Sequence, residues 1–188
     1  MNQHVIRPVR TDEWEKAKEL RLTALNDPVA PMAFLENAAE ATERPDAFWQ
    51  DRTGRASQGR DVRQFIAEGP YGQWNGTVTV LVEERGSSDF LGRTVERTQG
   101  HLVAVFIRPG HRGAGLAEAL FGAALEWAWS LEKPALERVR LFVHEENARA
   151  GAFYRRFGFV ASGCVVPMPG KPGERELEYA LPRPAPAA

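Results

Sequence analysis

The sequence is poor in cysteine, carries almost no net charge and has no long apolar run. Its one cysteine, Cys164, excludes an internal disulfide framework and a zinc site built on several thiolates, and it fits a reducing cytoplasm. No apolar stretch approaches the ~20 residues that cross a bilayer, and residues 1–10 lack the apolar core of a signal peptide. We therefore expect a cytoplasmic protein with no membrane partner.

The balance of positive and negative charge gives no indication of a nucleic-acid or membrane partner. The 24 basic and 25 acidic side chains leave a formal charge of −1, so no global field favours nucleic acid or an anionic membrane. Basic clusters with interleaved aromatic residues are also missing, and we expect no nucleic-acid partner. A length of 188 residues with 43% apolar and 26% charged residues is typical of one globular domain.

The apolar periodicity predicts a mixed α/β domain over residues 1–181. Strands are expected at 5–9, 62–67, 77–82, 102–107, 139–143, 159–166 and 176–181. Helices are expected at about 11–24, at 34–52 with an interruption at Pro45, at 114–131, and from Asn147 to Phe157, with a polar loop at 53–60. The order is strand, two helices, three strands, helix, strand, helix, two strands, which predicts a single mixed sheet with parallel crossovers in its second half. Residues 182–188 are expected to be a disordered Pro/Ala tail.

A glycine-rich turn joins the apolar run 102–107 to the long helix. In Arg112-Gly113-Ala114-Gly115-Leu116-Ala117, unpaired backbone N–H groups would lie at a helix N-terminus, where a pyrophosphate binds well. Gly113 and Gly115 lack a Cβ and allow close approach, and Arg112 adds a positive charge. A Walker loop is excluded because no Gly-Lys-Ser/Thr follows, and the dinucleotide motif is excluded because Glu118 stands in place of the third glycine.

A second segment follows about thirty residues later. Asn147 is followed by Tyr154 seven residues on, and then by Gly158-Phe159. Together with Arg112-x-x-Gly115-x-Ala117, this segment resembles the two signatures of the GNAT acetyltransferase superfamily. The resemblance is specific over residues 102–159 and extends loosely, through the element order, across the domain.

The resemblance implies a twisted mixed sheet flanked by helices, with acetyl-CoA as co-substrate and no metal. It implies N-acetyl transfer to a primary amine, of a small molecule or a protein, by direct attack in a ternary complex. A non-catalytic acyl-CoA-binding sensor of the same fold is the alternative. Dimers are common in the superfamily, and the edge strands of this chain are compatible with a homodimer.

The resemblance also assigns cofactor contacts. Val105, Phe106 and Ile107 would offer backbone groups to the pantetheine and the acetyl carbonyl, where two parallel strands splay apart. The pyrophosphate would be held by Arg112, Gly113, Ala114, Gly115, Leu116, Ala117 and Glu118. Asn147 is expected to cap a helix with its side-chain oxygen, which leaves its amide free to face the cofactor.

Two residues are the expected catalytic groups. Tyr154 matches the family's usual proton donor to the leaving thiolate, although it also fits a core stripe with Ala150 and Phe157. His101 stands where several relatives carry a glutamate base, and an imidazole with an ordinary pKa of ~6.5 can take the amine's proton. If strand alternation holds, His101 shares a face with Val103 and Val105.

Other groups remain open as the base or as pocket residues. Glu145 and Glu146 are weaker candidates for the base, and a chain of water molecules could serve instead. The acceptor pocket is expected between the first helices and the closing strands, with Met32, Phe34, Trp49 and Arg52 as plausible lining residues.

Overall fold

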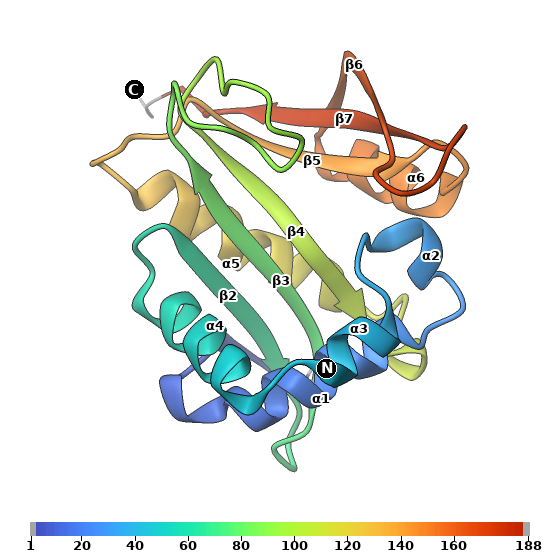
Figure 1. The fold of residues 1–188 in the computed structure, drawn as a ribbon. Helices are drawn as coiled ribbons and strands as arrows, with labels where there is room; N and C mark the ends of the chain where they lie inside the picture. Colours follow the sequence, from blue (N-terminus) through green and yellow to red (C-terminus); the bar gives the residue numbers. More distant parts are fainter. Residues whose placement is uncertain (1–2, 186–188) are drawn as a thin grey trace.

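The computed structural model describes residues 3–185, which form one seven-stranded mixed sheet with helices on both faces (Figure 1). The strands are β1 (Val5–Pro8), β2 (Val62–Glu68), β3 (Trp74–Glu83), β4 (Gln99–Ile107), β5 (Arg138–His144), β6 (Val160–Pro167) and β7 (Arg175–Pro182). The helices are α1 (Trp14–Leu25), α2 (Ala30–Ala33), α3 (Ala38–Glu43), α4 (Asp46–Gln58), α5 (Leu116–Ser130) and α6 (Ala148–Phe157). The sheet order is β1-β2-β3-β4-β5-β7-β6, and β4–β5 is its one parallel pair within the described residues. The expected fold class is confirmed.

Two apolar layers cover the two faces of the sheet. Alternation along β2 sends Phe65 and Ala67 into a core with α5 and α6, while Ile66 enters a second core with α1 and α4. A strand buried on both faces reads as a continuous apolar run, which is the pattern that predicted a central strand at 102–107. The strand β4 lies in the middle of the sheet.

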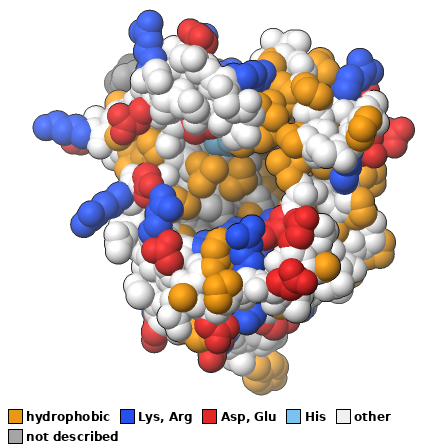
Figure 2. Space-filling view, viewed as in Figure 1, with side chains coloured by type: hydrophobic (Ala, Val, Ile, Leu, Met, Phe, Trp, Pro, Cys, Tyr) orange, Lys and Arg blue, Asp and Glu red, His pale blue; other side chains and the backbone are white. Residues whose placement is uncertain are grey.

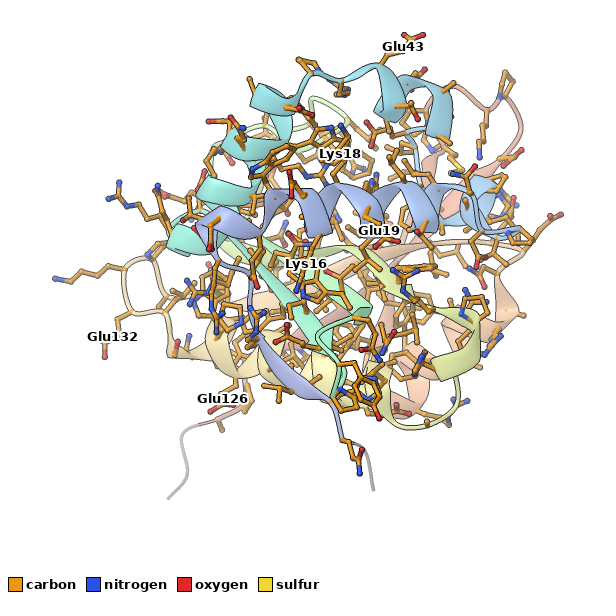
Figure 3. The ribbon with its side chains drawn as sticks, turned by 90° about the horizontal axis from the view of Figure 1, so that it is seen from below. Lys16, Lys18, Glu19, Glu43, Glu126 and Glu132 are labelled. Atoms are coloured by element: carbon orange, nitrogen blue, oxygen red, sulfur yellow. The ribbon has the colours of Figure 1, made fainter. Side chains whose placement is uncertain are left out.

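The N-terminal helix crosses one face of the sheet and is tied to its neighbours at the surface. Lys18 donates to Asp46 of α4 at 2.9 Å, and Lys16 donates to the carbonyl oxygen of Gly72 in the β2–β3 turn at 3.1 Å. Figure 3 shows the two lysines on opposite sides of α1, with Glu19 on the same helix. Glu19 accepts from Arg108, the residue that follows β4, at 2.7 Å. The helix is thereby fixed over the end of β4.

The helix expected from residue 34 begins only at Ala38, after the short and unexpected helix α2. Two further expected boundaries are wrong. Residues 53–58 continue α4 because Thr53 and Ala56 are buried against the sheet, and the helix ends at Gly59, with φ of 65°. The predicted tail begins too early: Pro182 belongs to β7, and the backbone N–H of Arg183 donates to Glu137 at 2.9 Å. Residues 186–188 of that tail lie outside the described residues. In both places a tertiary contact orders a segment whose composition is polar or proline-rich.

A bulge in β4 positions the functional region. Ala104 has φ of 53°, and the pairing of β4 with β3 shifts register opposite it. Leu102 and Val105 therefore both face the α5 side, while Phe106 faces the α1 side. The expectation that His101, Val103 and Val105 share one face is wrong, because the bulge reverses the alternation after Val103.

The same region opens the sheet. The parallel pairing of β4 with β5 covers only Gln99–Arg138, Gly100–Val139 and His101–Arg140, although both strands continue. Beyond His101 the two strands separate. This splay is the one implied by the family resemblance, and His101 lies at its apex.

Candidate functional site

Two pockets meet in the opening between β4 and β5. One has a volume of about 280 Å³ and lies toward the glycine-rich turn, and the other has a volume of about 310 Å³ and lies toward β7. We call them the donor groove and the acceptor pocket. Both are lined by Phe34, Val105, Asn147, Ala150 and Tyr154, so these residues form the boundary between the two spaces.

The donor groove gathers most of the predicted cofactor residues. It is lined by Val105, Phe106, Ile107, Arg112, Gly113, Ala117, Glu118 and Asn147. Ala114 and Gly115 are not among its lining residues, and the Leu116 side chain is buried in the core against the sheet. The assignment of Leu116 to the cofactor therefore applies at most to its backbone.

The glycine-rich turn has the conformation that a phosphate loop requires. Gly113 and Gly115 both have φ of 78°, and Gly115 is the N-cap of α5. The backbone N–H groups of Gly113, Ala114 and Gly115 donate to no described residue, and no atom lies within 4 Å of a Cβ built on either glycine. Unpaired donors thus face open space at the positive end of a long helix.

Arg112 is held by the protein itself. Its Nη2 donates to Oδ2 of the buried Asp27 at 2.7 Å, and its Nε donates to the carbonyl oxygen of Ile107 at 2.9 Å. Arg149 and Arg156 of α6 also line the groove, and the sequence analysis missed them. The available signal was their spacing of seven residues, which places two residues on one helix face.

The ring of Tyr154 packs in the core and also reaches the junction of the two pockets. The ring stacks on Phe121 at 5.8 Å with an interplanar angle of 28°, and it lines both the donor groove and the acceptor pocket. Its hydroxyl hydrogen-bonds to no described residue. Burial raises the pKa of Tyr154 to about 12, so the phenol keeps its proton at neutral pH. Asn147 accepts from the backbone N–H of Ala150 at 3.2 Å, which confirms the expected cap.

His101 is buried and lines the acceptor pocket. Its Nδ1 lies 3.4 Å from Oε2 of Glu83, and its ring lies 5.7 Å and 5.5 Å from the rings of Phe90 and Phe142. Burial tends to raise the pKa of Glu83, but hydrogen bonds from His101 and Arg140 outweigh it and lower that pKa to about 2. A carboxylate on one side of the imidazole favours a proton on Nδ1 and leaves Nε2 as an acceptor.

The acceptor pocket is mainly apolar. Figure 2 shows hydrophobic side chains gathered in a hollow over β4, with Lys and Arg side chains along one rim. Met32, Phe34 and Arg52 line it as expected, but Trp49 is fully buried in the core between α4 and the sheet. Arg52 makes no hydrogen bond or ion pair with a described residue, whereas Arg21 pairs with Glu36 at 3.1 Å.

The carboxylates proposed as weaker bases do not reach this pocket. Neither Glu145 nor Glu146 lines it, and Glu145 pairs with Arg175 at 2.7 Å, which lowers the pKa of Glu145. The acidic residue that does line it on the β7 side is Glu176, which the sequence analysis counted only as a strand residue. Alternation within a strand could have placed Glu176 on one face, but not in this pocket.

Two further properties concern the described residues 3–185. They contain no group of three or more His, Cys, Asp or Glu side chains arranged to hold a metal ion. No helix among them is both long enough and apolar enough to cross a bilayer.

Comparison with known proteins relates this chain to acetyltransferases. Residues 31–159 match the model of the acetyltransferase (GNAT) family. The mycothiol acetyltransferase of Salinispora tropica is 31% identical over 122 residues, which are 65% of this chain and 34% of the relative. The mycothiol acetyltransferase of Kineococcus radiotolerans is 29% identical over 171 residues, which are 81% of this chain and 54% of that relative. The chain thus spans about a third to a half of the length of these curated relatives.

Solved structures share the fold across nearly the whole chain. A spermidine N-acetyltransferase from Vibrio cholerae, in complex with CoA and spermine, has a TM-score of 0.68 and 18% identity, and covers 97% of each chain. The PaiA N-acetyltransferase from Thermoplasma acidophilum, in complex with coenzyme A, has a TM-score of 0.67 and 15% identity, with 93% and 97% covered. At these identities the likeness establishes the fold.

Proposed function

We propose that this chain, which belongs to the GNAT acetyltransferase family, transfers the acetyl group of acetyl-CoA to a primary amine by direct attack in a ternary complex. The observation that carries the proposal is the junction of two pockets at Tyr154. One pocket begins at a helix N-terminus with unpaired backbone donors, and the other is mainly apolar. This arrangement lets a thioester from one side meet an amine from the other.

The donor groove fits coenzyme A. Unpaired N–H groups at the start of α5 suit the pyrophosphate, and Arg149 and Arg156 add positive charge beside them. Beyond His101, β4 has no β5 partner, so its open edge at Val105 is available to the pantetheine arm, whereas the carbonyl oxygen of Ile107 already accepts from Arg112. Acetyl-CoA, bound there, supplies the reactive thioester.

The catalytic steps are assigned to two side chains. His101 takes a proton from the acceptor's ammonium group, so that the neutral nitrogen attacks the thioester carbon. As the carbon–sulfur bond breaks, Tyr154 gives its proton to the leaving thiolate and regains one from the new amide nitrogen. The phenol is protonated at neutral pH, and its position at the junction of the two pockets supports this role, because burial also keeps the proton on the phenol oxygen until a thiolate forms beside it.

Thiol release tests the proposal. Purified protein with acetyl-CoA is offered 2-phenylethylamine, spermidine, an amino acid and a lysine peptide, and free thiol is measured. We expect thiol release above the hydrolytic background with at least one amine. Binding of acetyl-CoA by calorimetry without thiol release from any amine would favour a sensor module instead.

Tyr154→Phe completes the test. We expect kcat to fall by ~10²–10⁴-fold, the range typical of a general acid, with the Kd for acetyl-CoA unchanged. Tyr179→Phe is the matched control, since Tyr179 is equally buried but accepts from Arg155 and lines neither pocket. Equal turnover of Tyr154→Phe and wild type would reduce Tyr154 to a packing residue.

A further inference from the structure

Glu176 is a buried carboxylate without a partner. It is 8% exposed, lies opposite His144 of β5 and Val166 of β6, and lines the acceptor pocket. It makes no hydrogen bond and no ion pair with any residue that the structure describes. Glu178, two residues further along the same face of β7, is 4% exposed but pairs with Arg138 and Arg140 at 3.1 Å and 3.0 Å.

The neighbours of Glu176 do not neutralise it. His144 on β5 donates from Nε2 to Glu174, 2.9 Å away, and its Nδ1 accepts from the backbone N–H of Glu146. Lys171, in the loop between β6 and β7, makes no hydrogen bond with Glu176 and affects it only by electrostatic attraction. Burial outweighs both of these groups and raises the pKa of Glu176. An uncompensated buried carboxylate destabilises a protein, so a ligand that brings a positive charge would be stabilised at this place.

The rest of the pocket restricts that ligand. Met32, Phe34, Phe90 and Phe142 present apolar surface, which binds a carbon skeleton better than a polar chain. Arg21 and Glu36 in the same pocket pair with each other, whereas Arg52 makes no hydrogen bond or ion pair with a described residue and lies over the Trp49 ring at 5.8 Å. The charge of Arg52 disfavours a molecule with several ammonium groups. Resting on the acetyl transfer proposed above, we infer that Glu176 binds the acceptor's ammonium group, and that the acceptor is a singly charged primary amine on an apolar skeleton.

Glu176 then acts before the chemical step. The carboxylate accepts one N–H of the ammonium, His101 removes a second proton through a chain of water molecules, and the nitrogen keeps its hydrogen bond to Glu176 while its lone pair attacks. The proton balance of the reaction is unchanged, because Glu176 gains and loses none. Loss of the carboxylate should therefore weaken amine binding more than it lowers kcat.

Binding of a charged and a neutral ligand tests the inference. In the presence of CoA, calorimetry compares 2-phenylethylamine with N-acetyl-2-phenylethylamine on wild type, Glu176→Gln and Glu96→Gln. We expect Glu176→Gln to raise the Kd of the amine roughly 10–100-fold, the range of a charge-assisted hydrogen bond, and to leave that of the neutral amide unchanged. Glu96→Gln, which removes an exposed carboxylate outside the pocket lining, should bind both ligands like wild type.

Several outcomes would overturn it. Equal weakening of both ligands by Glu176→Gln, unchanged binding of both, or no amine binding by wild type each contradict an ammonium site at Glu176. A kcat/KM for spermidine equal to or above that for 2-phenylethylamine contradicts the single-charge class, for which we expect at least about a tenfold preference. If wild type binds the amine through Glu176 but releases no thiol, the acetyl transfer fails and the ammonium site stands.

Thermal unfolding gives a readout that needs no ligand. A pKa raised above the ordinary 4.5 means that the folded state holds the Glu176 proton more tightly than the unfolded chain. Stability is therefore lost as pH rises from about 4.5 through the folded pKa. We expect Glu176→Gln to have a higher Tm than wild type at pH 7, with the difference shrinking as pH falls. A lower Tm at pH 7 would indicate a structural role for the carboxylate.

Discussion

Gly115 occupies a backbone conformation that other residues adopt at a cost. Its φ of 78° costs a side-chain-bearing residue ~1–2 kcal/mol, although the space around a Cβ there is empty. We expect Gly115→Ala to move the loop N–H groups toward a less strained conformation and to weaken acetyl-CoA binding, measured by calorimetry. Gly122→Ala is the matched control, since Gly122 lies inside α5 with equally open space and a helical backbone.

The two alanine substitutions should change the stability of the protein in opposite directions. In urea unfolding, Gly122→Ala should gain up to about 1 kcal/mol from helix propensity, and its acetyl-CoA affinity should match wild type. Wild-type affinity in Gly115→Ala would contradict a role for this turn in holding the pyrophosphate.

His101 is expected to remove the proton from the acceptor amine. Because Nδ1 faces Glu83, Nε2 is the atom left to take that proton. We expect His101→Ala and His101→Gln both to lose most of the activity, with His101→Gln better folded because it fills part of the space beside Phe90 and Phe142. The measurement is kcat/KM with an amine found by thiol release, together with the Tm of each variant. Wild-type kcat/KM in both variants would assign the proton transfer to another group or to a water relay.

At the scale of elements, an ion network joins the strands behind the cleft. Arg140 of β5 donates to Glu83 of β3 at 2.8 Å and to Glu178 of β7 at 3.0 Å, and all three side chains are buried. Gln99 of β4 donates to Glu83 at 3.1 Å and accepts from Arg138 at 2.7 Å. The network ties the strands together where β4 and β5 still pair, just before they separate.

Removing the guanidinium group of Arg140 should therefore destabilise the protein strongly. We expect Arg140→Ala to lower the free energy of unfolding by up to ~3–5 kcal/mol, because two buried carboxylates each lose one cationic partner, leaving Glu178 with Arg138 and Glu83 with Gln99 and His101. The change should be smaller in acid, since the Glu83 carboxylate, with a pKa of about 2, contributes stability that is present above its ordinary 4.5 and lost as pH falls toward 2. Urea unfolding at several pH values measures both effects.

The exposed pair Arg55–Asp61 provides the comparison. Both side chains are more than half exposed at a distance of 2.7 Å, and Arg55→Ala should change stability by ~0–1 kcal/mol. A loss in Arg140→Ala no larger than this would mean that the network contributes little to holding the strands.

At the scale of the whole molecule, three distant parts of the chain meet at the opening where we propose that acetyl transfer takes place. The segment after α1 and the helix α4 form one wall of the acceptor pocket, β4 and β5 form its floor, and β7 closes it. The donor groove is completed by α5 and α6. The two edge strands, β1 and β6, lie at opposite ends of the sheet, away from both pockets, so a homodimer through an edge remains a prediction that is compatible with an open site.

The sequence by itself determined the features that depend on neighbouring residues. Periodicity placed every strand of the sheet, Asn147 and Gly158 marked the ends of α6, and the Arg112–Ala117 run marked the start of α5. These features follow from local backbone preferences and capping, which a short stretch of chain expresses without help from the rest. The two motifs were sufficient to indicate the family for the same reason.

Tertiary structure alone decided which side chains face the opening and what they pair with. The bulge at Ala104 changes which side chains of β4 face each side of the sheet. Asp27 pairs with Arg112, which lies 85 residues further along the chain, and the Trp49 side chain lies in the core. In the sequence Glu176 cannot be distinguished from other charged strand residues, and only its neighbours in β5, β6 and the pocket show that it is buried. Burial and ion pairing depend on segments that only the folded chain brings together, and periodicity within one segment carries no information about them.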